Sequence, residues 1–169
     1  MRKQNGNALL KDIAYGMIGG AIGTVVMEQV ANLMYKFESE EKKKIEESIR
    51  KEPPFEAMAR RLSEDVFGIE ITDGTRSKLG QAIHWGTGIG FGGLYGALHD
   101  RVPALSKAAG LPYGVAFSLV VDEGLNTALK LTPPPQEFPI DAHVRGLVAH
   151  VAYTATADGV FHLLRKVAG

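Results

Sequence analysis

The 169-residue sequence predicts an all-α fold: a membrane-embedded four-helix bundle of antiparallel spans, forming one domain over residues 1–169. Three observations lead to this prediction. Four weakly charged stretches are each close to the ~20 residues that a helix needs to cross a ~30 Å hydrocarbon layer. Two of these stretches are rich in glycine, and a charged segment separates the first two. The expected spans are residues 13–35, 79–98, 111–130 and 142–164, with a charged amphipathic loop at 36–78.

The composition excludes several classes of protein. Nineteen basic and nineteen acidic residues give a formal net charge of zero, whereas a nucleic-acid-binding domain carries a basic surplus. The chain has no cysteine, which excludes disulfides, thiolate metal sites and cysteine nucleophiles. We therefore expect no nucleic acid as a partner.

The first stretch, residues 13–35, has Glu28 as its only formal charge. Basic residues precede it, as in a signal peptide, but no small-x-small cleavage site follows the apolar run. We expect a retained membrane helix. Pairs such as Glu38–Lys42 and Glu46–Arg50 favour its continuation as a solvated helix.

The charged segment, residues 36–78, should contain two helices. Pro53-Pro54 ends the first of them, and apolar residues at helical spacing predict a second helix at about residues 55–67. This short amphipathic helix is expected to lie at the membrane surface or to cap the bundle. The alternative is a soluble subdomain.

The second stretch, residues 79–98, contains seven glycines and no Asp, Glu, Lys or Arg. In water each interior glycine costs a helix ~1 kcal/mol relative to alanine. In lipid the helix persists, because unsatisfied backbone groups are too costly there, and small residues four apart let helices approach closely. The residues assigned to helix packing are Gly16, Gly20, Gly86, Gly88, Gly90, Gly92 and Gly96. Trp85 and Tyr95 are expected at the membrane interfaces.

The third and fourth stretches carry acids. The third contains Asp122 and Glu123 after its apolar part. A proline-rich connector follows at residues 132–139; because it cannot be helical, we expect it to run extended. The fourth contains Asp158 as its only acid, and His162 lies one helical turn further on. A local hydrogen bond near the membrane surface accounts for this last pair.

Several polar residues fall at one depth in the expected bundle. With a helical rise of ~1.5 Å per residue, the spans bring six side chains into a common band, and Arg145 lies nearby as a counter-ion. The six residues are Glu28, His84, Asp122, Glu123, Asn126 and His150. Ionisable residues inside membrane spans are costly and mark candidate functional sites.

Three interpretations of this intramembrane polar cluster remain open. The first is interhelical hydrogen bonding, with Glu28 paired to His84 and with Arg145 neutralising Asp122 or Glu123. The second is proton or ion handling by a carboxylate–histidine chain. The third is a cofactor site, in which His84, His150 and Glu28 bind a metal or a histidine ligates a haem or chlorophyll. No HExxH, ExxH or CxxC spacing supports a metal, and no cofactor is the expectation.

Four segments carry a family resemblance. They are Ala82-Ile83-His84-Trp85-Gly86-Thr87-Gly88-Ile89-Gly90 with the Leu94-Tyr95-Gly96 that ends this run, Gly23-Thr24 through Met27-Glu28, Leu131-Thr132-Pro133-Pro134, and Ala149-His150-Val151-Ala152-Tyr153. The sequence resembles the YagU-like family of small multi-pass bacterial inner-membrane proteins of unknown function. The resemblance implies a multi-pass helical protein of the cell inner (cytoplasmic) membrane, and it points to Glu28, His84 and His150.

No catalytic residues are predicted, because no serine lies in a Gly-x-Ser-x-Gly elbow and no other catalytic constellation is present. The glycine-rich spans favour a non-enzymatic packing or accessory subunit of a membrane assembly. Its partners would be the lipid bilayer and either further copies of the chain or a larger membrane complex. The alternatives are a small proton- or ion-handling transporter and a cofactor-carrying subunit.

Overall fold

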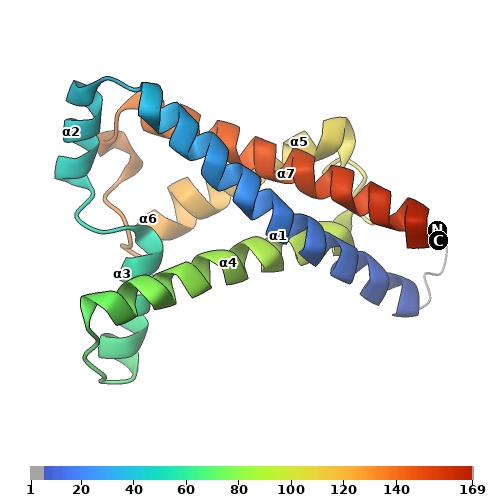
Figure 1. Ribbon diagram of the computed structural model, residues 1–169, viewed down its shortest axis with the longest axis horizontal. Helices are drawn as coiled ribbons and strands as arrows, with labels where there is room; N and C mark the ends of the chain where they lie inside the picture. The colour runs from blue at the N-terminus through green and yellow to red at the C-terminus, as the bar shows by residue number, and fades with distance from the viewer. Residues whose placement is uncertain (1–5, 169) are drawn as a thin grey trace.

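The computed structural model describes residues 6–168, and every regular element in that range is helical (Figure 1). Three long helices dominate: α1 (Gly6–Phe37), α4 (Asp73–Leu98) and α7 (Ile140–Ala168). A fourth segment consists of α5 (Lys107–Phe117), the π-helical stretch η2 (Ser118–Leu125) and α6 (Asn126–Ala128). The four segments alternate in direction, so the start of α1 and the end of α7 lie at the same end of the molecule (Figure 1). The all-α prediction is confirmed.

Helix α1 lies between α4 and α7, and α5 packs on α7. Glycine makes these contacts close. A Cβ atom built at Gly20 would lie 2.6 Å from the carbonyl oxygen of Gly88, and one at Gly19 would lie 2.7 Å from that of Ala157. Both distances are shorter than real Cβ contacts, so α1 can pack this closely on both neighbours only where it lacks side chains.

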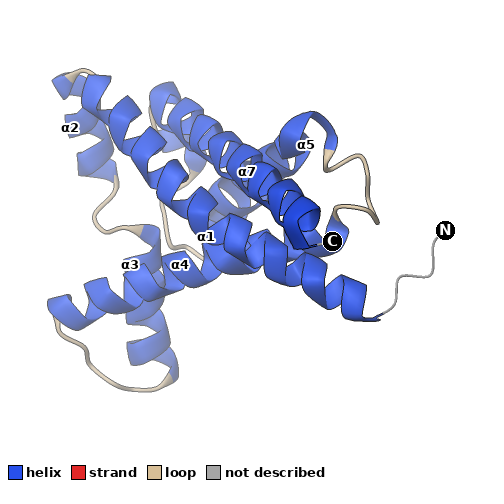
Figure 2. Ribbon diagram, turned by 45° about the vertical axis from the view of Figure 1, so that its right-hand side comes forward, coloured by secondary structure: helices blue, strands red, loops and turns tan. Residues whose placement is uncertain are grey.

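The charged segment does not continue α1. The chain turns at Ser39, whose Oγ accepts a hydrogen bond from the Lys42 backbone N–H and so caps a new helix, α2 (Glu40–Ile49). The expected single helix was therefore wrong at this point, because Ser39 adopts an extended backbone and starts α2 separately. Helix α3 (Pro54–Arg61) begins at a proline and runs into the π-helical turn η1 (Leu62–Val66). Figure 2 shows α2 and α3 at the end of the bundle away from the termini, with α3 beside α4.

The fourth segment is less regular than the helix expected at residues 111–130. Ala108, Ala109 and Gly110 have positive φ angles of 49°, 56° and 74°, so the chain enters the segment through a left-handed turn. From Ser118 to Leu125 the helix is π-helical. The connector that follows contains one 3₁₀ turn, η3 (Pro135–Glu137), where a fully extended chain was expected.

An aromatic core fills the space between α4, α5 and α7. It is formed by Tyr95, Tyr113, Phe117 and Tyr153 together with the aliphatic Val121. Tyr95 has no solvent exposure, and its hydroxyl donates a hydrogen bond to Asp158. Its side chain therefore faces the interior of the bundle and not its outer surface.

Among the described helices, α1 alone is both long and apolar enough to cross a membrane. Helix α4 contains many glycines, α7 contains charged and other polar residues, and the fourth segment is divided into shorter helices. The four membrane spans therefore remain a prediction.

Candidate functional site

Two carboxylate–histidine pairs connect the helical segments of the bundle. Glu28 on α1 meets His84 on α4, with 3.1 Å between Oε1 and Nε2. Asp122 on η2 meets His150 on α7, with 3.3 Å between Oδ2 and Nδ1. The same Nδ1 lies 2.8 Å from the Gly146 carbonyl oxygen, so this nitrogen carries the hydrogen and Nε2 is left as the basic nitrogen of His150.

A third pair lies closer to the charged end. Nδ1 of His143 is 2.7 Å from Oε1 of Glu123, and its Nε2 is 3.0 Å from the carbonyl oxygen of Pro135. Both partners are acceptors, and only a doubly protonated imidazole donates from both nitrogens. His143 was not among the site residues predicted from the sequence, although it stands at the start of the fourth stretch.

Both acids of the third stretch lie in the π-helical stretch η2. A π-helix inserts an extra residue per turn and is frequent at functional sites. In η2 the neighbouring residues Asp122 and Glu123 reach two different histidines of α7, His150 and His143. A feature of this kind has no simple sequence signature.

A cavity of about 180 Å³ is lined by Asp122, Glu123 and His143, which belong to two of these pairs. Two polar atoms of its lining, Nε of Arg50 and Oγ1 of Thr127, are buried without a hydrogen-bond partner among the described residues. Asn126 also lines the cavity and is 6% exposed. Such a volume with unpaired polar groups suits water or a small polar ligand. The predicted residues that line it are Asp122, Glu123, Asn126 and Arg145.

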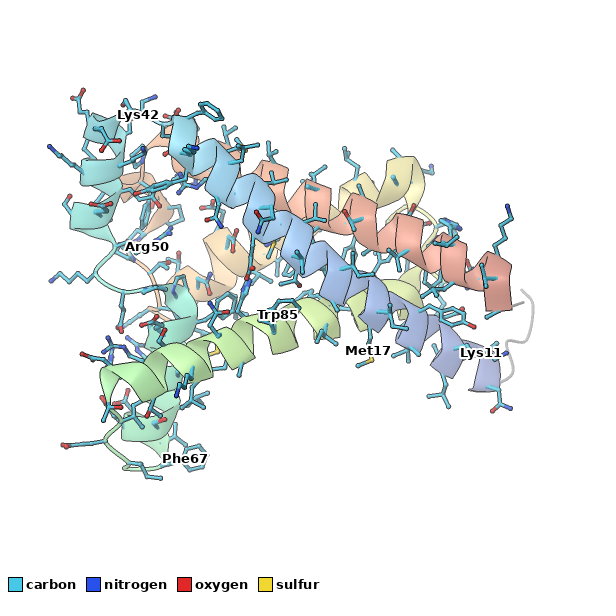
Figure 3. The ribbon with its side chains drawn as sticks, in the orientation of Figure 1. Lys11, Met17, Lys42, Arg50, Phe67 and Trp85 are labelled. Atoms are coloured by element: carbon cyan, nitrogen blue, oxygen red, sulfur yellow. The ribbon has the colours of Figure 1, made fainter. Side chains whose placement is uncertain are left out.

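Two of the remaining predicted residues, Glu28 and His150, lie one helical turn from residues that line the cavity. Ala31, which lines it, is one turn beyond Glu28 on α1, and Gly146, which also lines it, is one turn before His150 on α7. Neither Glu28 nor His84 is among the residues that line the cavity. Figure 3 shows Arg50 at the end of the molecule covered by the charged segment, the end opposite Lys11.

Arg145 does not neutralise Asp122 or Glu123, as the structural interpretation assumed. Its guanidinium is bound by two acids of the charged segment: Glu46, at 2.6 and 2.7 Å, and Glu38. Arg145 is 8% exposed and Glu46 is 6% exposed. This ion pair connects α2 to α7. Asp122 and Glu123 of η2 instead contact the histidines His150 and His143.

The proposed metal ligands Glu28, His84 and His150 do not form a three-ligand group. Among the described residues, the one cluster of three or more His and acid side chains whose ligand atoms lie within 4.8 Å of one another consists of other residues, His99, Asp158 and His162.

The glycines predicted to pack helices together fall into two groups. Gly16, Gly20, Gly88, Gly92 and Gly96 lie at α1–α4 contacts, whereas Gly86 and Gly90 have nothing within 4 Å of an added Cβ.

Comparison with known proteins places this architecture in a family. A family model described as "Protein of unknown function (DUF1440)" matches residues 48–159, about two thirds of the chain. The match runs from the end of α2 into α7 and includes His84, Asp122 and His150. No curated protein and no solved structure matches the chain. The chain belongs to the DUF1440 family of proteins of unknown function.

Proposed function

We propose that this protein is a multi-pass helical protein of the cell inner membrane that moves protons through its carboxylate–histidine pairs and polar cavity. The observation that carries the proposal is the arrangement of two pairs, Glu28–His84 between α1 and α4 and Asp122–His150 between η2 and α7. Asp122 of the second pair also lines the cavity.

The distribution of side chains supports a lipid environment. Large apolar side chains are exposed along α1, the fourth segment and α7, whereas charged residues such as Asp12, Arg145 and Asp158 are buried. A water-soluble protein has the opposite preference. In membranes, helix contacts use small residues and polar residues face the bundle interior. The exposed apolar side chains include Leu10, Ile18, Ile22, Leu33, Leu119, Val120, Val144, Val148 and Leu163.

The chemistry of the pairs supports proton transfer. Imidazole titrates near neutral pH and both accepts and releases a proton, and chains of carboxylates and histidines are the usual parts of intramembrane proton relays. The cavity supplies a polar space beside Asp122 and Glu123, in which water can connect them to the charged end.

The accessory-subunit hypothesis retains one observation in its favour. Gly86 and Gly90 are exposed, lie one turn apart on α4, and have free space where a Cβ would be. A second helix can pack closely on such a surface. Gly88, Gly92, Gly93 and Gly96 of α4 already contact α1, and Gly80 contacts Glu56 of α3. The glycine surface left for a partner is therefore smaller than the sequence indicated.

The test is a proton-flux assay in liposomes that contain the purified protein. A pH gradient is imposed and an internal pH dye is followed for the wild type, Glu28→Gln, Asp122→Asn and the control Glu70→Gln, which replaces an exposed acid in the charged segment. We expect flux in the wild type and control, and its loss in the two cluster variants while each variant stays folded and monodisperse in detergent. Wild-type flux no greater than that of empty liposomes would contradict proton movement. Unchanged flux in both cluster variants would exclude these residues from it.

A further inference from the structure

A second group of ionisable side chains lies at the end of the bundle that carries the termini. His99 directly follows α4, and Asp158 and His162 lie one turn apart on α7. Nε2 of His99 is 3.6 Å from Oδ1 of Asp158, and Nε2 of His162 is 3.4 Å from the same oxygen. The three ligand atoms lie within 4.8 Å of one another.

We propose that His99, Asp158 and His162 form a binding site for a divalent transition metal of the Zn²⁺ class. Two imidazoles and one carboxylate are a common protein ligand set for zinc, with water in the fourth position. Zinc–ligand bonds of about 2.0–2.1 Å in a tetrahedron put neighbouring ligand atoms ~3.3–3.5 Å apart. The two distances from Asp158 Oδ1 are close to this spacing.

The hydrogen bonds around the group orient it as the surroundings of a metal site do. Nδ1 of His99 is 2.7 Å from Oδ1 of Asp100, so Nδ1 donates to that carboxylate and the lone pair of Nε2 is directed at Asp158. Metal-binding histidines usually make such a bond from their other nitrogen. The Tyr95 hydroxyl donates to Asp158 Oδ1 at 2.5 Å and fixes the carboxylate from the core side.

The local charge also favours a cation. Asp12, Asp100 and Asp158 contribute three negative charges, and Arg165, which binds Asp12 at 2.8 Å and Asp100 at 2.9 Å, contributes one positive charge. With neutral imidazoles, these four side chains have a net charge of −2, which a divalent ion balances. No ion pair joins Arg165 to Asp158 among the described residues, so Asp158 remains available.

The site is also accessible. The His99 and Asp158 side chains are 11% and 10% exposed, whereas His162 is 57% exposed. A metal can therefore enter beside His162 and retain a water ligand on that side. The sequence interpretation of Asp158–His162 as a local pair was incomplete, because His99, 59 positions earlier in the chain, completes the group.

The test measures metal content and affinity in the full chain, purified in detergent without a polyhistidine tag. The protein is stripped with chelator, given Zn²⁺ and desalted; Co²⁺ is titrated in parallel, because tetrahedral Co²⁺ has a characteristic visible spectrum. The variants are His162→Ala and Asp158→Asn. His162 is exposed, so its replacement leaves the core intact. The matched control, His143→Ala, removes a histidine at the other end of the bundle.

We expect about one Zn²⁺ per chain in the wild type and in His143→Ala, and an affinity at least ~10-fold lower in His162→Ala and Asp158→Asn. The Co²⁺ spectrum should indicate tetrahedral coordination in the wild type and disappear in both variants. A wild-type chain that retains no metal would overturn the proposal. Loss of metal in His143→Ala but not in His162→Ala would also overturn it, because the metal would then lie in the polar cavity.

Discussion

Nε2 of His84 on α4 lies 3.1 Å from Oε1 of Glu28 on α1, and the pair is partly buried between two helices that otherwise meet through glycines. We expect the two side chains to be energetically coupled. In a double-mutant cycle of Glu28→Gln and His84→Gln, the coupling should be about 0.5–2 kcal/mol, the range for polar contacts between membrane helices. Unfolding by denaturing detergent in mixed micelles measures it. Additive single and double variants would show that the contact contributes nothing to stability.

Two glycines one half-turn apart on α4 should respond oppositely to the same substitution. A Cβ at Gly92 would lie 2.6 Å from the Cα of Gly20, while a Cβ at Gly90 would meet nothing within 4 Å. Gly92→Ala should lower the free energy of unfolding by ~1–3 kcal/mol, because the new Cβ would meet backbone atoms of α1, which cannot move aside. Gly90→Ala should be neutral or slightly stabilising. Thermal unfolding in detergent distinguishes them, and equal effects would refute the α1–α4 packing described above.

Arg145 should be among the most sensitive polar residues of the chain. Its replacement by alanine leaves the buried Glu46 carboxylate without its principal partner, which typically costs ~3–5 kcal/mol. Lys44→Ala, at an exposed position of α2, serves as a control and should change stability little. Adding Glu46→Gln to Arg145→Ala should restore part of the loss. No rescue by the second substitution would mean that Glu46 is not the group left uncompensated.

The ion pair between Asp100 and Arg165 should make stability depend on acid pH. The hydrogen bond from Arg165 lowers the pKa of Asp100 to about 2, from an ordinary value near ~4. Because the folded-state pKa is the lower one, the stabilisation is present above about pH 4 and is lost as the pH falls towards 2. The unfolding temperature of the wild type should therefore fall more steeply over this range than that of Asp100→Asn. Parallel curves for the two proteins would contradict the pairing.

The helical fold could be predicted from the sequence because its signals are local. Apolar stretches, glycines four residues apart and the Pro53-Pro54 break each act within a few turns, and the structure places helices at all four predicted stretches. The turn at Ser39 was missed, because favourable i,i+4 charge pairs run across it. The π-helical stretch η2 was missed because hydrogen-bond spacing in a helix depends on packing against α7 rather than on a motif.

The candidate site was predictable only in part. Depth along the helices correctly paired Glu28 with His84, because both lie on regular helices whose rise is known. Depth carries no information about rotation around the helix axis. The prediction from depth therefore paired Arg145 with Asp122 or Glu123. In the structure Arg145 instead donates hydrogen bonds to Glu38 and Glu46. Depth also could not join His99 to Asp158, since that contact depends on where the chain leaves α4.

The absence of cysteine allows the surroundings of the bundle to be probed directly. Val148 lies on the outer face of α7 and is 41% exposed, and Lys44 is exposed on α2. Single cysteines at these positions are treated with a membrane-impermeant maleimide in membranes opened by sonication, where both faces are accessible. If lipid surrounds the bundle, Lys44→Cys reacts at once and Val148→Cys reacts only after denaturing detergent is added. Equal rates at the two positions before detergent would show that water, and not lipid, covers the apolar face.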